Sequence, residues 1–386
     1  MKIDPMESNM KAIVIGAGIV GSSVTYRLSE AGVDVTVLEA GRIAGGTSGT
    51  SFAWINSNNK PPRAYHDLNV AGMSAHRRIK EEFGGKAPWL HETGNLEWRS
   101  DPAQRAAQLE KVERLKSWDY PVELLTVKQL TELEPDIDPE SVGDATIAFY
   151  PGEGYVDPAV YSASMLQVAR RRGAKIICGA KVADLMTKGG RVVGVKLADS
   201  REFTADIVVN CTGRWVNEIA REQAFHIPMA SNVGFLVFTP SAGTTLQRPL
   251  HTDDISVRPD GAGRLMVRRE DLDRAVTIDT KPSPALEPAR EAVRRAAKIL
   301  PALAGCEPEA ARITIRPSPA DGHSAVGPVP GIDGFYMVIT HSGVTLGAFL
   351  GAAVADEIAK GITRAELEVF RPSRFHNQQH RIANNY

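Results

Sequence analysis

The sequence predicts a mixed α/β fold of two domains, and three observations support this expectation. The chain has 386 residues, which at roughly 150 residues per domain is enough for two. Residues 12–39 contain an apolar run, a glycine-rich turn, a helical pattern and a second apolar run, the order of a βαβ unit. Two later β-rich stretches, 175–210 and 233–278, supply strands for further sheets. We therefore expect both a parallel and an antiparallel sheet.

Composition and charge favour a folded protein that acts on a small molecule. Hydrophobic residues make up 43% and charged residues 24%, close to globular averages, which excludes the disordered and low-complexity classes. The 45 Lys and Arg residues balance 46 Asp and Glu residues, and no long basic run indicates a nucleic-acid or membrane surface. No apolar stretch reaches the roughly 20 residues of a spanning helix. We expect no nucleic-acid partner and no transmembrane segment.

The cysteines and histidines indicate a reducing compartment and no catalytic metal. Cys178, Cys211 and Cys306 are too few for a disulfide framework, and none has a zinc-binding spacing. Cys178 and Cys211 lie in apolar strands, so we expect both to be buried. The first ten residues lack the apolar core of an export signal. A cytoplasmic location is therefore expected.

The first half of the chain alternates strand and helix patterns. A strand over residues 12–15 and a helix up to Ala31 are followed by a strand over 33–38, with Gly32 at the position of a left-handed helix C-cap. A long loop rich in Gly, Ser, Thr and Asn comes next. Further helices are expected over 68–83, over 102–117, before Glu134-Pro135, and from the Asp157-Pro158 N-cap to Arg172.

The second half is richer in strands. A meander with a turn at 188–191 is expected to end in the apolar strand over 207–210. A hairpin turn at 259–261 joins two strands of the second β-rich stretch. The remaining predicted elements are a helix over 286–300, strands over 313–316 and 335–340, and a last helix from Ser342 to Lys360.

The glycine-rich turn predicts a Rossmann-like dinucleotide site. Gly16-x-Gly18-x-x-Gly21 lies between a strand and a helix, where it allows a tight turn and close approach of backbone N–H groups to a pyrophosphate. Glu39 ends the second strand, where its carboxylate can accept hydrogen bonds from a ribose diol and would repel a 2′-phosphate. A glycine turn without a ligand is the alternative. The motif does not decide which dinucleotide binds.

The chain as a whole resembles the D-amino acid oxidase-like family of FAD oxidoreductases, which includes glycine oxidase, sarcosine oxidase and D-amino acid dehydrogenases. The resemblance lies in six segments in family order, 14–21, 46–51, 154–158, 206–215, 316–322 and 341–347. It implies a Rossmann-like FAD-binding domain of the glutathione-reductase type from residues 1–85, 151–225 and 310–386. It further implies an α+β substrate domain with a large, mainly antiparallel sheet from residues 86–150 and 226–309.

The resemblance also implies the residues that hold FAD. The hydroxyl and backbone donors of the loop after Gly46 would hold the phosphates and the flavin ring, and the start of the last helix would stabilise negative charge on that ring. A plain polar loop, a helix start chosen for packing and a core valine at 182 are the alternatives. The candidates are Gly16, Ala17, Gly18, Ile19, Val20, Gly21, Glu39, Ala40, Thr47, Ser48, Gly49, Thr50, Ser51, Val182, Cys211, Thr212, Gly213, Trp215, Ser342, Gly343, Val344, Thr345 and Leu346.

The mode of FAD attachment follows from one cysteine position. The sarcosine oxidase branch attaches its flavin through a cysteine shortly before the Asp-containing turn. No cysteine lies between residues 310 and 321 of this chain, so we expect non-covalent FAD.

Two residues are candidates for catalytic contacts with a carboxylate substrate. A carboxylate is best held by a planar, two-pronged guanidinium. Arg316 matches the arginine that grips the substrate carboxylate in glycine oxidase-like members, and a structural ion pair is the alternative. His341 stands where the glycine oxidase branch has an arginine, so it replaces a permanent cation by a group that titrates near neutrality. A histidine that only supports its neighbours is the alternative.

Three further residues are candidates for the substrate pocket. Trp54 and Asn56 follow the polar loop and would shape the pocket near the flavin, although a tryptophan there can equally belong to the core. Arg258, at a strand end, would line the cavity or stand exposed on the hairpin.

The resemblance implies an enzyme that oxidises the CH–NH bond of an amino acid or secondary amine. Hydride passes to flavin N5, the imine is hydrolysed, and O2 or another electron carrier reoxidises the flavin. The alternatives are a flavoenzyme for 2-hydroxy acids, a non-catalytic FAD-bearing assembly factor and an NAD-dependent enzyme. The sequence leaves open the substrate, its chirality, the oxidant and the oligomeric state.

Overall fold

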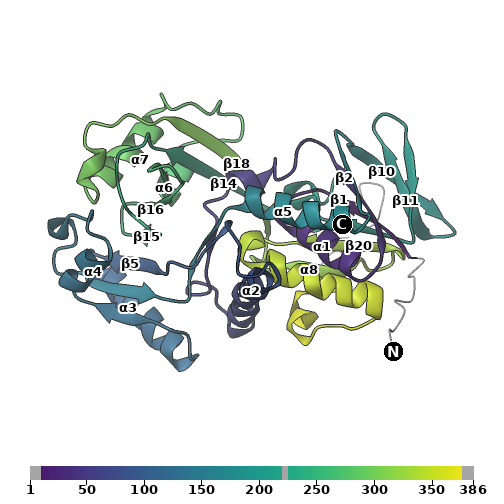
Figure 1. Cartoon of the computed structure of the whole chain (residues 1–386), viewed down its shortest axis with the longest axis horizontal. Coiled ribbons are helices and arrows are strands. Elements are labelled where there is room, and N and C mark those ends of the chain that lie inside the picture. The colour runs from purple at the N-terminus through teal and green to yellow at the C-terminus, as the bar shows by residue number, and fades with distance from the viewer. Residues whose placement is uncertain (1–9, 220–224, 376–386) are drawn as a thin grey trace, which may run out of the picture.

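The computed structural model describes residues 10–219 and 225–375, which form two lobes side by side (Figure 1). One lobe is built on a six-stranded sheet whose strands are parallel except for the antiparallel edge strand β19. The strand order is β19 (Ala325–Pro328), β20 (Phe335–Ile339), β13 (Ile207–Asn210), β1 (Lys11–Ile15), β2 (Asp34–Glu39) and β9 (Lys175–Cys178).

Both faces of this sheet are covered, which explains its nearly continuous apolar strands. Ala12 and Val14 of β1 face a helical layer, and Ile13 and Ile15 face the opposite side. The helical layer consists of α1 (Ile19–Glu30), α5 (Pro158–Arg171), α8 (Gly343–Lys360) and α2 (Arg63–Glu82). The other face carries a meander of β10 (Val182–Lys188), β11 (Arg191–Leu197) and β12 (Glu202–Thr204).

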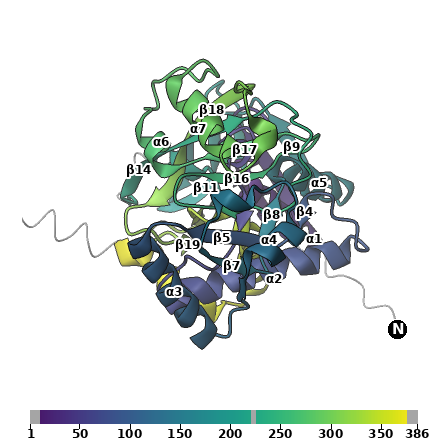
Figure 2. The ribbon, with the colours of Figure 1, turned by 90° about the vertical axis from the view of Figure 1, so that its left-hand side faces the viewer.

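The second lobe contains an eight-stranded sheet that is antiparallel except where β15 pairs with β5. Figure 2 views this lobe end on, with α6 (Glu270–Arg274) and α7 (Glu287–Ala297) above and α3 (Pro102–Ser117) below. The strand order is β18 (Ala310–Pro319), β14 (Met229–Phe238), β17 (Leu265–Arg268), β16 (Ser256–Pro259), β15 (Leu250–His251), β5 (Asn95–Arg99), β7 (Thr146–Tyr150) and β6 (Glu123–Leu125).

Strand β18 belongs to the larger sheet along its whole length. It pairs with β14 in antiparallel register from Ala310 opposite Phe238 to Pro319 opposite Met229. The sequence assigned residues 310–386 to the cofactor part of the chain, so this strand begins at the predicted boundary and pairs with a strand of the other part. The division into two domains otherwise stays a prediction.

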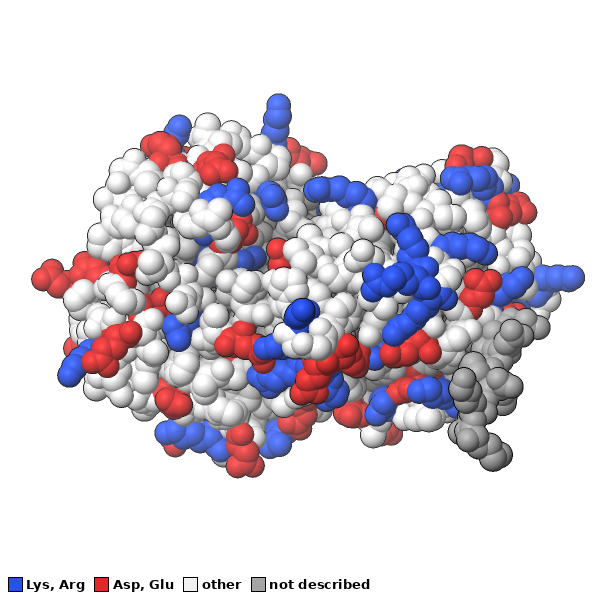
Figure 3. Space-filling model, in the orientation of Figure 1, with Lys and Arg blue, Asp and Glu red and all other residues white. Residues whose placement is uncertain are grey.

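The remaining elements complete the connection between the lobes. A small sheet consists of β3 (Trp54–Ile55), β8 (Gly154–Val156) and β4 (Leu90–His91), and β3 contains Trp54, a predicted pocket residue. Helix α4 (Val127–Leu133) ends before Glu134, as predicted. Helix α2 begins five residues before the predicted start, and its first turn already buries Tyr65, three residues before Leu68. Acidic and basic side chains are interspersed over the face in Figure 3. No helix in the described part is long and apolar enough to cross a membrane.

Candidate active site

Two adjoining cavities lie at the carboxyl ends of the parallel strands, where open α/β sheets bind ligands. The larger has a volume of about 620 Å³ and extends from the β1–α1 turn to the start of α8. The smaller, of about 270 Å³, lies between the polar loop, β14 and β18. They share Thr47, Ser51, Pro317, His341 and Val344, so molecules in the two cavities would touch each other.

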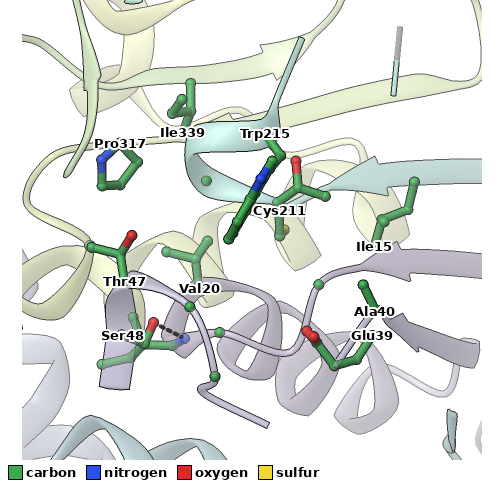
Figure 4. A pocket seen from close by; sticks show the side chains of 18 of the residues that line it. Ile15, Val20, Glu39, Ala40, Thr47, Ser48, Cys211, Trp215, Pro317 and Ile339 are labelled. Atoms are coloured by element: carbon green, nitrogen blue, oxygen red, sulfur yellow. Dashed lines mark hydrogen bonds between the residues drawn. The ribbon is translucent and has the colours of Figure 1, made fainter. Parts of the chain in front are cut away.

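The β1–α1 turn forms one wall of the larger cavity (Figure 4). Gly16 has φ +98°, and a Cβ there would approach the Cys211 carbonyl oxygen at 2.9 Å. A Cβ at Gly21 would lie 2.0 Å from the Gly16 oxygen, so this glycine allows close helix packing. The Ile19 N–H donates to Ser48 Oγ at 3.0 Å. The first turn of α1 has no internal acceptors for its N–H groups and therefore attracts an anion.

Glu39 lines the same cavity at the end of β2. Its carboxylate accepts the Ala17 N–H at 2.8 Å and the Gly41 N–H at 2.7 Å. A carboxylate has about four acceptor positions, so two stay available for a diol. Ala40 and Val182 line the cavity beside it.

The polar loop forms a 3₁₀ turn, η1 (Thr47–Thr50), beside the β1–α1 turn. Thr47 Oγ1 donates to the Ile315 carbonyl of β18 at 3.0 Å, and Arg312 Nη1 donates to the Gly49 carbonyl at 3.0 Å. A Cβ at Gly49 would lie 2.4 Å from the Ala44 oxygen, so this glycine serves the turn itself. The loop is thus fixed to both lobes.

The opposite wall follows β13. Cys211, Thr212 and Gly213 line the larger cavity, and Figure 4 shows the Trp215 ring projecting into it from the 3₁₀ turn η3 (Gly213–Trp215). The Cys211 thiol is buried, and burial raises its pKa, so it is not a reactive thiolate. Cys178 is exposed at the end of β9, so the expectation that it is buried was wrong because this edge strand leaves its last residue open.

The N-terminus of α8 closes the far end. Ser342 Oγ lies 2.8 Å from the Tyr65 hydroxyl, and the Ser342 N–H donates to Thr340 Oγ1 at 3.1 Å. Gly343 lines the larger cavity, Ser342 and Thr345 line the smaller, and Val344 lines both. The first-turn N–H groups and the positive end of the helix dipole therefore lie between the cavities.

The residues around the larger cavity fit FAD. The α1 N-terminus suits a pyrophosphate, Glu39 suits a ribose, and Pro317, Ile339 and Val344 give apolar walls for a flat ring. A Cβ at Gly18 would approach Ser48 Oγ at 3.0 Å, close to where the cofactor phosphates would bind. Among the residues that line the larger cavity, Pro317 of β18 is the one that belongs to the eight-stranded sheet.

The smaller cavity brings Arg316 together with a second arginine. Arg316 Nη2 and Arg268 Nη2 both donate to Asp273 Oδ2, at 2.6 Å and 2.8 Å, and Asp273 is buried. Asp273 Oδ1 accepts the Phe235 N–H at 2.7 Å. A Cβ at Gly234 would lie 3.2 Å from Nε and Nη2 of Arg316, so glycine makes room for the guanidinium. Both arginines line the cavity.

His341 lines both cavities, and Lys60 lines the smaller one. Burial and the charges of Lys60, Arg316 and Arg268 lower the pKa of His341 to about 3. The sequence expectation of a histidine titrating near neutrality is therefore wrong, because neighbouring cations favour the neutral ring. Burial also lowers the pKa of Lys60 to about 8, although Glu153 opposes this shift.

Trp54 and Asn56 line the smaller cavity, as the sequence proposed, and a buried carboxyl holds their segment. Glu153 accepts the Trp54 Nε1–H at 3.0 Å, the Asn58 Nδ2–H at 3.1 Å and the Tyr120 hydroxyl at 2.6 Å. The Asn56 N–H donates to Thr345 Oγ1 at 3.4 Å, which joins the segment to α8.

Arg258 lies behind the pocket. It is buried, donates to the Phe52 and Pro259 carbonyls, and lies 5.0 Å from the Tyr155 ring centroid. Neither cavity includes it in its lining. Both expectations for this residue, a cavity arginine and an exposed one, were wrong because two carbonyls draw it inward.

The remaining sequence candidates fall into two groups. Thr50 and Thr345 line the smaller cavity instead of the larger. Ala17, Gly21, Gly49 and Leu346 line neither, and pack behind the turns that do. Sequence reasoning missed Lys60, Arg268, Asp273 and Glu153. Arg268 and Asp273 are five residues apart in the chain, but no motif or spacing marks any of the four as part of a pocket.

The chain is similar to proteins of a known family. The family described as DAO, FAD dependent oxidoreductase, matches residues 11–357. The chain is 23% identical over 380 residues to a glycine oxidase of Bacillus licheniformis, covering 96% of this chain and 98% of that protein.

Two solved structures have a similar fold. L-proline dehydrogenase from P. horikoshii has a TM-score of 0.83 at 22% identity, covering 96% of this chain and 98% of that one. Iminodiacetate oxidase from Chelativorans sp. BNC1 has a TM-score of 0.81 at 22% identity, covering 94% and 98%. With the family match over most of its length, the chain belongs to the DAO family of FAD-dependent oxidoreductases.

Proposed function

We propose that this FAD-dependent oxidoreductase oxidises the CH–NH bond of an amino acid or a related secondary amine. Arg316 is the observation that carries the proposal. Asp273 fixes it in a small cavity that adjoins the larger one by taking one N–H of its Nη2, and the remaining N–H groups of the guanidinium can donate to a substrate carboxylate. The similarity to a glycine oxidase supports an amino-acid substrate.

The chain's own residues prepare the substrate for oxidation. FAD, when bound, supplies the acceptor for the hydride that leaves the substrate carbon. Arg316 orients that carbon by holding the carboxylate. Enclosure in the small cavity disfavours a charged ammonium, so the substrate amine releases its proton to solvent before oxidation. Water then hydrolyses the imine product.

The test is anaerobic addition of D-amino acids, L-amino acids, N-alkyl glycines and 2-hydroxy acids to the holoenzyme, followed by the flavin absorbance. Bleaching by amines alone supports the proposal. Bleaching by hydroxy acids alone overturns it in favour of alcohol oxidation, and bleaching by none leaves the assembly role as the better explanation. Admission of air then distinguishes an oxidase from a dehydrogenase.

Arg316→Ala tests the carboxylate contact. We expect kcat/KM for the best substrate to fall about 10- to 100-fold, mainly through KM, because a charge-assisted hydrogen-bond pair is lost. Arg294→Ala, on the exposed face of α7, is the control and leaves KM unchanged. An unchanged KM in Arg316→Ala contradicts the assignment.

A further inference from the structure

We propose that the substrate carries two anionic groups, most simply two carboxylates, because the smaller cavity contains more positive charge than one carboxylate neutralises. The inference rests on the proposed function and names the substrate class of that site. It depends on three cations, their partners and the size of the cavity.

The two arginines share one carboxylate. Arg268 and Arg316 both donate to the same oxygen of Asp273, so one of their two positive charges stays without a counter-charge. The described lining of the smaller cavity contains no Asp or Glu. One substrate carboxylate on Arg316 would neutralise this surplus.

Lys60 adds a second positive charge to the cavity, and Asp273, which pairs with both arginines, forms no ion pair with it. No carboxylate in the described part of the chain lies within ion-pair distance of Lys60, whose Nζ lies 5.9 Å from the centroid of the Tyr65 ring. Glu153 influences it electrostatically without forming an ion pair. Lys60 is partly buried, and the desolvation of its ammonium costs free energy that an anion in the cavity would recover.

The cations come from different parts of the cavity wall. Arg268 and Arg316 project from the larger sheet, and Lys60 lies on the segment that leads into α2. A volume of about 270 Å³ corresponds to roughly nine water molecules at about 30 Å³ each. A small diacid amine has about this size, so its two carboxylates can meet the arginines and Lys60 at once.

Binding of unreactive acids to the oxidised holoenzyme tests the inference without requiring turnover. Succinate and butyrate have the same chain length and differ in one carboxylate, and their dissociation constants follow from calorimetry and from perturbation of the flavin spectrum. We expect succinate to bind at least about tenfold more tightly at neutral pH, as close charge pairs at desolvated sites do. Equal affinities overturn the inference.

Lys60→Met removes the second cation while keeping the length of the side chain. We expect it to abolish most of the preference for succinate and to leave butyrate binding unchanged. Lys128→Met, on an exposed helix, is the matched control. Equal weakening of both acids by Lys60→Met overturns the assignment of Lys60 to the second carboxylate.

The preference also depends on pH. Lys60 faces Glu153, His341, Arg268 and Arg316, and its pKa of about 8 means that it loses its charge at mildly alkaline pH. We expect the preference for succinate to fall above about pH 8 and to persist there in Lys60→Arg, whose side chain stays charged. If neither acid binds, the carboxylate contact and the proposed function fail together, whereas equal binding overturns only the second anionic group.

Discussion

His341 contributes a neutral ring to the place where the two cavities meet. Its pKa of about 3 means that protonation is negligible at neutral pH. Because the neutral form dominates, the ring can donate one hydrogen bond and accept another, but it adds no charge for a substrate anion. Arg316, Arg268 and Lys60 therefore supply the charge that an arginine at position 341 would otherwise provide.

The neutrality of His341 has a kinetic consequence. We expect His341→Gln to leave the shape of the kcat/KM profile unchanged from about pH 5 to about pH 8, since no ionisation of this ring occurs there. The absolute rate falls if the ring touches the substrate. Loss of an ionisation from the profile in the variant would contradict a lowered pKa.

Glu153 is a buried carboxyl whose partners form one edge of the pocket. Burial raises the pKa of Glu153 to about 7, although the hydrogen bonds that it accepts from Tyr120 and Asn58 act in the opposite direction. In Glu153→Gln an amide N–H₂ faces the donors of Trp54 and Asn58, which costs about 1–3 kcal/mol. Because native Glu153 keeps a proton between about pH 4.5 and 7 that the unfolded chain releases, this group makes stability fall as pH rises through that range.

The measurement for Glu153 is the free energy of unfolding at two pH values. The variant lacks the ionisation, so its loss of stability is larger near pH 5 than near pH 8, by up to about 3 kcal/mol. Glu123→Gln, on the exposed β6 strand, is the control. The same difference at both pH values would falsify the raised pKa.

At the scale of elements, α1 and α8 pack so closely that their backbones nearly touch. A Cβ at Gly351 of α8 would lie 2.6 Å from the Ser23 oxygen of α1. Glycine normally weakens a helix by about 1 kcal/mol relative to alanine, but here a backbone carbonyl occupies the space and cannot move independently. The close approach therefore makes alanine at position 351 destabilising, although alanine normally stabilises a helix relative to glycine.

Gly351→Ala is expected to lower the free energy of unfolding by about 1–3 kcal/mol, as overpacking does. Urea unfolding of the apoprotein measures it. Gly343→Ala provides the comparison, because its Cβ would meet Val20 at an ordinary 3.6 Å and stability should change by less than about 0.5 kcal/mol. A Gly351→Ala protein as stable as the original would show that the helices can separate freely.

Helices and strands could be predicted where neighbouring residues in the sequence determine the structure. The βαβ unit, the left-handed Gly32 that follows its helix and the helix after Asp157 follow from turn and capping chemistry, and the structure confirms them. The membership of β18 in the larger sheet was not predictable, because register with β14 depends on residues about 80 positions apart. A single strand does not reveal its partner.

For the molecule as a whole, cofactor binding should contribute to stability. FAD that binds the native state at a concentration 100-fold above its dissociation constant stabilises it by about 2.7 kcal/mol. We expect the melting temperature of the apoprotein to rise with FAD concentration. NADP⁺ should cause no rise, since Glu39 repels a 2′-phosphate. An equal rise with both would contradict the proposed role of Glu39.

Much of the cofactor cavity followed from the sequence, and much of the substrate cavity did not. The candidates around Gly16, Glu39 and Ser48 come from contiguous motifs whose turns dictate residue types. Arg268 and Arg316 lie on strands separated by β14, and only the fold brings their guanidiniums to one carboxylate. Charges that meet through tertiary structure leave no spacing pattern in the chain.

The attachment of η1 to β18 makes cofactor and substrate binding thermodynamically linked. Thr47 bonds to Ile315, the residue directly before Arg316, and Arg312 of the same strand bonds to Gly49. A cofactor that orders this loop also fixes the strand that carries the guanidinium, so the apoprotein should bind succinate more weakly than the holoenzyme. Linkage is reciprocal, so a bound carboxylate ligand should lower the dissociation constant of FAD by the same free energy.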